Sequence, residues 1–236
     1  MSFYLWINLL TFLFPFLLSF DKKVAFFKSW RSVIPATLMV GVIFIVWDIY
    51  FTKNEIWWFN EEYLTGIDVF GLPIEECLFF FTIPYACVFI FEVIKAYFPK
   101  MGLHQFCYWF SFLFTIFTII MAFSYSANWY SFSAFLTAGL LNWIVYFGWT
   151  PKWYNHFIVS FLITLIPFII VNGILTGSIT EAPVVGYNES HIVGIRIGTI
   201  PLEDVFYNFS LLFPIVIIHQ FIDGLFQKKK AKSLKA

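Results

Sequence analysis

The chain has 236 residues, of which 61% are hydrophobic and only 12% are charged, and its formal net charge is zero. Soluble domains carry about 25% charged residues, so a chain of this size cannot hide so much apolar surface in a soluble core, and lipid has to be its solvent. The neutral balance gives no indication of a nucleic-acid partner, and the three cysteines are expected to be small buried hydrophobes, not disulfides or metal ligands.

Seven apolar stretches predict an all-α integral membrane protein with seven transmembrane helices. The first stretch has no basic residue before it and no small-residue cleavage site after it, so we expect a retained helix and not a signal peptide. The predicted spans, in chain order, are 3–20, 33–51, 73–97, 104–126, 130–149, 155–176 and 200–226.

The basic residues predict how these spans are oriented. If the N-terminus lies outside, twelve of the 14 Lys and Arg residues fall on the inner side, and only Lys53 and Arg196 fall in outer loops. Basic residues collect in the cytoplasmic loops of membrane proteins. The sequence therefore predicts an outside N-terminus, a cytoplasmic C-terminus and a multi-pass location in the cell membrane.

A short motif occurs twice and suggests an internal repeat. Pro-Ile-Glu-Glu at 73–76 opens the third span, and Pro-Leu-Glu-Asp at 201–204 opens the seventh, 128 positions later. Three helices, one connecting helix and three further helices place the two halves parallel, related by an axis along the membrane normal. The predicted division is a first three-helix repeat at 1–100, a linking helix at 101–128, a second repeat at 129–227 and a basic cytoplasmic tail at 228–236.

The motif has a structural and a functional interpretation. Proline and acidic residues are favoured in the first turn of any helix, which would explain a single copy. Recurrence at matching helix starts favours function, because charges at a membrane segment are costly and a carboxylic acid in an apolar pocket keeps its proton and can act as a general acid. The catalytic candidates are the four acids Glu75, Glu76, Glu203 and Asp204.

We expect only one acid of each pair to face the cavity, because adjacent helical residues point about 100° apart. Phe79 and Tyr207 lie one turn further on and favour Glu75 and Glu203 as the inward members. Aromatic faces at these positions could also stabilise a carbocation.

Residues 45–92 and 199–213 resemble the membrane-integral lycopene cyclases. In that family two small subunits, each with a Pro-x-Glu-[Glu/Asp] motif, form the enzyme in some bacteria, and the halves are fused in archaea and fungi; this chain resembles a fused form over roughly residues 1–226. The resemblance rests on Trp47, Asp48, the segments 58–60 and 72–80, Pro84 and Glu92, and on the second motif at 201–204. The second half departs from the pattern, with Asn172 and Gln220 where the first half has Asp48 and Glu92.

The resemblance implies a lycopene β-cyclase of carotenoid biosynthesis, an isomerase that needs no cofactor and no metal. A terminal double bond of lycopene is protonated, a ring closes through a carbocation, and a proton is lost. Lycopene or a related acyclic carotenoid and membrane lipid are the implied partners, while a homo-oligomer or association with other carotenoid enzymes stays open. The residues expected to contact substrate are Asp48, Phe79, Glu92, Tyr207 and Asn208.

Two other classes remain as alternatives. Small transporters are also built from two parallel three-helix repeats around a connecting helix. Their polar residues lie near the middle of the bilayer, whereas the acids here concentrate on one membrane side. A purely structural membrane subunit would leave the repeated acid pairs unexplained. No nucleotide-binding glycine motif is present, and the four histidines are scattered along the sequence.

Overall fold

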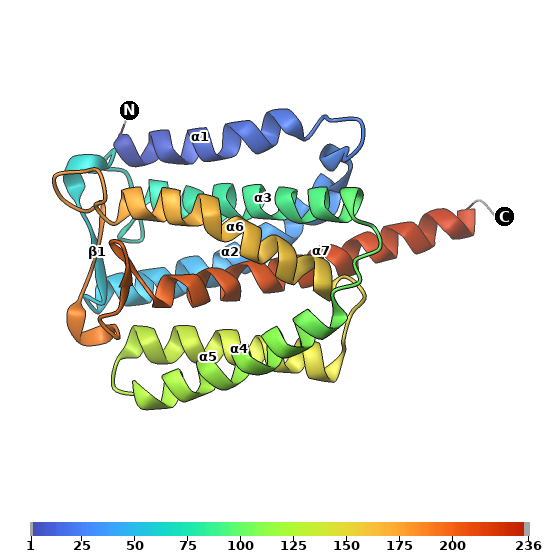
Figure 1. The fold of residues 1–236 in the computed structure, drawn as a ribbon. Helices are drawn as coiled ribbons and strands as arrows, with labels where there is room; N and C mark the ends of the chain where they lie inside the picture. Colours follow the sequence, from blue (N-terminus) through green and yellow to red (C-terminus); the bar gives the residue numbers. More distant parts are fainter. Residues whose placement is uncertain (1, 234–236) are drawn as a thin grey trace.

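The computed structural model describes residues 2–233 and shows seven apolar helices that run between two ends of the molecule (Figure 1). Each predicted span overlaps one of them over most of its length. Six are long and apolar enough to cross a membrane, whereas α1 has 16 residues. The helices are α1 (Phe3–Leu18), α2 (Trp30–Lys53), α3 (Ile74–Tyr97), α4 (His104–Ser124), α5 (Trp129–Gly148), α6 (Tyr154–Leu175) and α7 (Glu203–Ser233).

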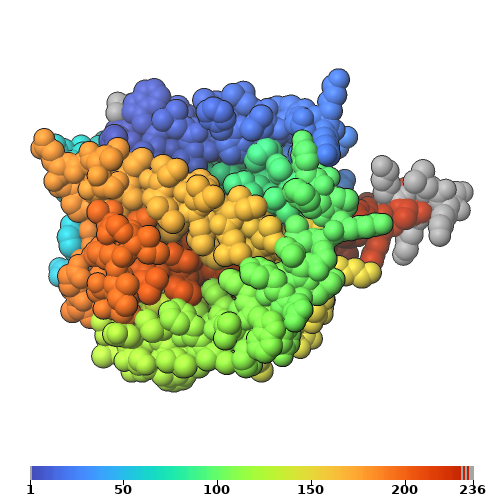
Figure 2. All heavy atoms as spheres, in the orientation of Figure 1, coloured from blue at the N-terminus to red at the C-terminus, as the bar shows by residue number. Residues whose placement is uncertain are grey.

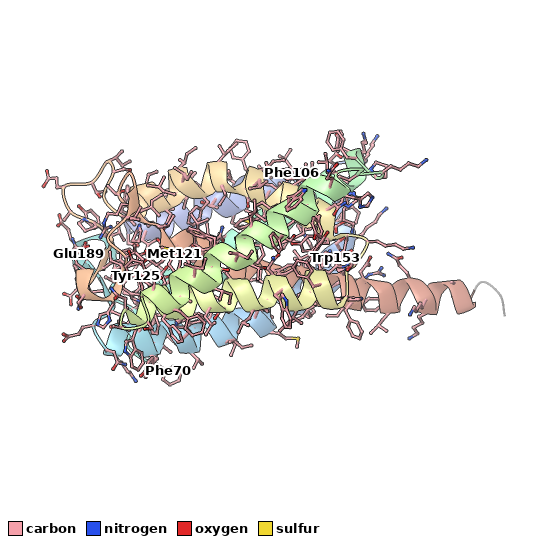
Figure 3. The ribbon with its side chains drawn as sticks, turned by 60° about the horizontal axis from the view of Figure 1, so that its bottom comes forward. Phe70, Phe106, Met121, Tyr125, Trp153 and Glu189 are labelled. Atoms are coloured by element: carbon pink, nitrogen blue, oxygen red, sulfur yellow. The ribbon has the colours of Figure 1, made fainter. Side chains whose placement is uncertain are left out.

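Helices α3 and α7 hold the bundle together. Helix α3 packs against both α1 and α6, α7 packs against both α2 and α5, and α2 also contacts α3. Helix α4 packs along α5 at the edge of the bundle (Figures 1 and 3). Phenylalanine rings fill the interior; Phe209, for example, lies 4.6 Å from Phe114 and 5.1 Å from Phe213 between ring centroids.

Apolar side chains also cover the outside of the bundle. Phe14 is 71% exposed, and Phe123 and Ile166 are both 65% exposed. Such a continuous apolar surface is stable in lipid and not in water. The long apolar helices and this surface together make the chain a multi-pass membrane protein.

One end of the bundle, the strand end, carries six short strands and two of the three 3₁₀ turns, none of which the all-α prediction included. The strands are β1 (Trp57–Phe59), β2 (Asp68–Val69), β3 (Leu72–Pro73), β4 (Val185–Tyr187), β5 (Arg196–Ile197) and β6 (Ile200–Pro201). The turns are η2 (Glu61–Tyr63) and η3 (Glu189–His191) at this end and η1 (Phe26–Ser29), which precedes α2.

The two loops that lead into α3 and α7 have the same local structure. A hairpin, β2–β3 or β5–β6, ends at the motif proline, so that Asp68 pairs with Pro73 and Arg196 with Pro201. In the first hairpin, Phe70 and Gly71 both have positive φ, as a two-residue type I′ turn requires. Each hairpin therefore delivers an acid pair directly to the first turn of a helix.

Strands β1 and β4 join the two halves of the chain. They pair antiparallel, with Trp57 opposite Tyr187 and Phe59 opposite Val185. The backbone bonds just outside this ladder are reciprocal, since Asn60 donates to Val184 and Asn188 donates to Ile56, both at 2.9 Å. This two-fold arrangement places the acid-bearing starts of α3 and α7 around a common centre.

The opposite end, the tail end, differs from the prediction in one respect. The seventh predicted span ends at 226 and is followed by a basic tail at 228–236, but α7 continues to Ser233. Alternating basic and small residues do not interrupt a helix, so the break in hydropathy is not a break in structure. Residues 234–236 of the predicted tail lie outside the described residues.

Candidate active site

A small pocket of about 60 Å³ lies at the strand end, where the starts of α3 and α7 meet the ends of α2 and α6. Both halves of the chain supply its walls. The polar and aromatic lining residues are Tyr4, Asp48, Trp57, Phe59, Glu76, Phe79, Tyr130, Phe168, Asn172, Tyr187, Asp204, Tyr207 and Asn208. Six of the nine predicted site residues are among them: Asp48, Glu76, Phe79, Asp204, Tyr207 and Asn208. The other three, Glu75, Glu92 and Glu203, do not line the pocket.

Two carboxyl groups of the first half contact each other in this pocket. The side chains of Asp48 and Glu76 are both buried and lie close enough to interact directly. Two buried carboxyl groups repel each other when both are ionised, so this arrangement favours one proton between the two groups. The Trp57 indole donates to Asp48 at 2.5 Å and the Tyr4 hydroxyl donates to Glu76 at 2.5 Å, which fixes both side chains.

The second half contributes one carboxyl group surrounded by neutral donors. Asp204 accepts hydrogen bonds from the Tyr130 hydroxyl, from the Asn172 amide at 2.6 Å and from the Tyr187 hydroxyl at 2.8 Å. Burial, and next the neighbouring Asp204, raise the pKa of Tyr187 well above its ordinary value, so this hydroxyl keeps its proton and remains a donor. A carboxyl group that only accepts, from three donors, has the surroundings of an ionised carboxylate.

Two donors in the pocket wall have no partner among the described residues. The Tyr207 hydroxyl and the Asn208 amide nitrogen are buried and make no hydrogen bond there. The Tyr207 ring is held by Phe44 and Trp47, whose centroids lie 5.1 and 5.3 Å away. Together with Phe79 it gives the pocket an aromatic wall beside the acids.

A family model for lycopene cyclases matches residues 1–94 and 127–222. The chain belongs to the lycopene cyclase family. The two matched segments contain every polar residue of the pocket, and the stretch between them holds α4 (His104–Ser124). No curated protein and no solved structure matches the chain.

In this lycopene cyclase family protein the other two motif acids face away from the pocket, which corrects the expectation that Glu75 and Glu203 point inward. Glu75 accepts from the Ser2 hydroxyl at 2.5 Å and from the Thr65 amide at 2.7 Å. Glu203 accepts in the same way from the Ser131 hydroxyl and the Val193 amide, both at 2.5 Å. These two acids therefore fasten the entry loop and the first helix of each half to the start of α3 or α7.

The expectation was wrong because helical spacing fits both members of each pair. Phe79 is four residues after Glu75 but three after Glu76, and residues three and four apart both share a helix face. The loop segments just before the two hairpins bring the Thr65 and Val193 N–H groups to the outer side of each helix start, and these bonds decide which acid turns outward.

Glu92, which the sequence analysis expected to contact substrate, does not line the pocket. It lies 16 residues after Glu76 on α3, about 24 Å along a helix, at the tail end. There it accepts from Lys95 at 2.7 Å, bonds to the buried His219 at 2.9 Å and accepts from Gln220 at 3.2 Å. Glu92 and Gln220 are the positions matched between the two halves, and they meet where α3 approaches α7.

The sequence analysis missed the four aromatic residues that donate hydrogen bonds to the pocket acids: Tyr4, Trp57, Tyr130 and Tyr187. Tyr4 and Tyr130 occupy the first turn of α1 and α5 and donate to the motif acids of their own half. Trp57 and Tyr187 are partners in the β1–β4 pair. The one available signal is this pairwise placement in the repeat, since single aromatic residues are common throughout the chain. Among residues 2–233 no cluster of three or more His, Cys, Asp and Glu side chains could hold a metal ion.

Proposed function

We propose that this protein is a lycopene β-cyclase that closes the linear ends of lycopene into β-ionone rings by acid–base catalysis. The observation that carries the proposal is the pocket itself. In a lycopene cyclase family chain, two neighbouring buried carboxyl groups, Asp48 and Glu76, which we take to share one proton, lie beside Asp204, which accepts hydrogen bonds from three neutral donors. An acid and a base in one dry pocket are what a redox-neutral isomerisation needs.

The proposed reaction begins at the Asp48–Glu76 pair. The pair gives its proton to the terminal double bond of lycopene, which forms a C–H bond and leaves a tertiary carbocation. The π electrons of a second double bond of the same chain attack this cation, and the new C–C bond closes a six-membered ring. Loss of a proton from the carbon beside the resulting ring cation forms the ring double bond, so substrate and product are isomers.

Asp204 is the proposed acceptor of the last proton. Its negative charge also stabilises the cation before the proton leaves, and the Tyr207 and Phe79 rings add their electron-rich faces. The proton returns to the Asp48–Glu76 pair within the same pocket, where Glu76 lies close enough to Asp204 to interact with its charge.

Exclusion of water is a second requirement, because water would capture the carbocation. Strands β1 and β4 contribute Trp57, Phe59, Val185 and Tyr187 to the pocket wall and cover its strand-end side. The protein part of the proposed mechanism is therefore complete without a cofactor: residues hold the proton, take it back and keep the site dry.

Both halves build one pocket, so we propose one composite site in which the two ends of a lycopene molecule react in turn. The predicted topology, with the strand end outside and the tail end cytoplasmic, would put that site at the outer side of the bilayer. The polar groups of the pocket lie within the first two or last two turns of the helices or on strands β1 and β4, and not at the middles of helices, which supports a cyclase over the transporter alternative.

The test is pigment analysis in a bacterial host that accumulates lycopene. Expression of the chain is expected to replace lycopene with one-ring and two-ring carotenes, separated by liquid chromatography. The β ring keeps its double bond in conjugation with the polyene, so the absorption spectrum of each product distinguishes it from other ring types. Asp204→Asn, which keeps shape and loses the base, is expected to leave lycopene unchanged. Unchanged lycopene with the unaltered protein present in the membrane would overturn the proposal.

A further inference from the structure

A second cavity, here called the lateral groove, joins the catalytic pocket from the side. It has a volume of about 260 Å³ and lies between α1, α3 and α6. Three residues, Phe79, Phe168 and Asn172, line both spaces. In Figure 2, α3 in green is visible between α1 in blue and α6 in yellow and orange, the side on which this groove lies.

The lateral groove runs down α3 and opens to lipid. Its lining on α3 extends from Phe79 to Ile90, eleven residues and roughly 16 Å along a helix. On the α1 side, Leu10 is 57% and Phe14 is 71% exposed on the outer surface of the bundle. A molecule dissolved in the bilayer can therefore reach the lateral groove without passing through water.

We propose that the lateral groove binds the extended polyene chain of the substrate. The carotenoid enters sideways from the bilayer between α1 and α6, and its end group reaches the Asp48–Glu76 pair past Phe79 and Phe168. This inference rests on the proposed function and adds to it the binding site for the unreacted part of the molecule.

The lining of both spaces selects this occupant over a phospholipid. No Lys or Arg is among the described residues that line the lateral groove or the pocket, so no cation is present to pair with a phosphate head group. The pocket end instead carries Asp48, Glu76 and Asp204, which repel an anion. An uncharged chain with an apolar end is the occupant that these walls accept.

The matching place in the second half is closed. Asp48 and Asn172 occupy equivalent positions on α2 and α6, so Phe44 and Trp47 are the counterparts of Phe168 and Val171. The rings of Phe44 and Trp47 pack against Tyr207, the counterpart of Phe79. The larger Trp47 fills space that Val171 leaves open beside the lateral groove, and the substrate thus has one route into the pocket.

The bundle offers a control surface. A second apolar depression, of about 530 Å³, lies between α4, α6 and α7 and shares no lining residue with the pocket. Leu113 is part of its wall and is 59% exposed. A bulky residue there changes a lipid-facing surface of the same kind without touching the proposed substrate route.

The experiment obstructs the lateral groove from two sides. Ala86→Phe and Ala86→Trp fill it from α3, Thr11→Trp fills it from α1, and Leu113→Trp is the control. Lycopene conversion, normalised to protein in the membrane, is expected to fall with Ala86→Phe and to fall further with Ala86→Trp, by about ten-fold or more for the larger ring. Conversion by the control is expected to stay within about two-fold of that of the unaltered protein. Thr11→Trp, on the exposed wall, gives the result if Ala86→Trp does not accumulate.

A binding measurement separates this inference from the proposed function. Lycopene that co-purifies with the inactive Asp204→Asn protein is measured by its absorption, with and without Ala86→Trp or Thr11→Trp. If either obstructing substitution lowers the amount of retained lycopene, the lateral groove is supported as the binding site. This holds even if the unaltered protein makes no rings, a result that would contradict the proposed cyclase activity but not the binding site. If the obstructed variants convert and retain as much lycopene as the proteins without the obstruction, the inference is overturned, and the lateral groove is a surface that contacts lipid chains.

Discussion

The two sides of the pocket are built from the same frame and differ in chemistry. On the first side the carboxyl groups of Asp48 and Glu76 lie next to each other, whereas on the second side Asn172 stands where Asp48 would be and donates to Asp204. The outward acids Glu75 and Glu203, by contrast, have matching partners on both sides. The repeat therefore preserves its scaffold contacts while one carboxyl group is exchanged for an amide, and in the proposed mechanism this exchange separates the acid role from the base role.

The largest effect on lycopene conversion is expected when Glu76, an acid of the first side, is replaced. Glu76→Gln keeps the hydrogen bond to Tyr4 but removes the acid, and lycopene conversion should fall by about 10³-fold, within the range for general acids. The measurement is the rate of ring formation in membranes, normalised to protein. Retention of more than a tenth of the activity would show that Glu76 is not part of the proton-donating pair.

Asp204→Asn is expected to cost somewhat less, about 10²- to 10³-fold. The variant keeps a polar side chain for Tyr130 and Tyr187 but cannot take the final proton or stabilise the cation. A one-ring product that carries a hydroxyl group, detected by mass spectrometry, would show that the cation forms and is captured by water. Full activity would contradict the base role.

Asn172→Asp sharpens the comparison by giving the second side the chemistry of the first. Asp204 would lose the hydrogen bond from the Asn172 amide and would have a second carboxyl group as its neighbour. The new pair would then share a proton, and Asp204 could no longer accept one from the substrate. Conversion is expected to fall by roughly ten- to one hundred-fold. Asn172→Ser, which keeps a neutral donor, is the control and should retain most of the activity.

A smaller effect on catalysis is expected at the outward acids. Glu75→Gln and Glu203→Gln each weaken a buried bond to a backbone N–H, which should cost about 1–3 kcal/mol of stability. Conversion per folded molecule should stay within about five-fold. Thermal unfolding in detergent, followed with pigment analysis, checks both parts. Loss of activity as large as that of Glu76→Gln would restore these acids to the catalytic site.

The smallest effect on catalysis is expected at Glu92, far from both sides of the pocket. Glu92→Ala removes the shared anion of Lys95 and the buried His219 and should lower stability by roughly 3 kcal/mol. Ring formation at moderate temperature should be unchanged. Reduced affinity for lycopene in the folded variant would instead return Glu92 to substrate binding.

The amino-acid sequence by itself determined the membrane class and the helical spans, and it named six of the residues that line the candidate pocket. Long apolar runs specify helices in lipid because each backbone polar group must find a partner within its own segment. The duplicated motif indicated two helix starts, and the resemblance carried by residues 45–92 and 199–213 agrees with the family match. Asp48, Glu76, Phe79, Asp204, Tyr207 and Asn208 were named from the sequence and lie together in the pocket.

Only the tertiary structure decided which acid of each pair enters the pocket, which aromatic residues donate to those acids, and where Glu92 lies. Helical periodicity cannot distinguish Glu75 from Glu76, because the deciding groups, Ser2 and the Thr65 amide, come from another helix and from a loop. Tyr187 meets Asp204 through the pairing of strands more than a hundred residues apart in sequence. Local sequence sets spans and turns, but the direction of a buried side chain depends on partners that only packing brings near.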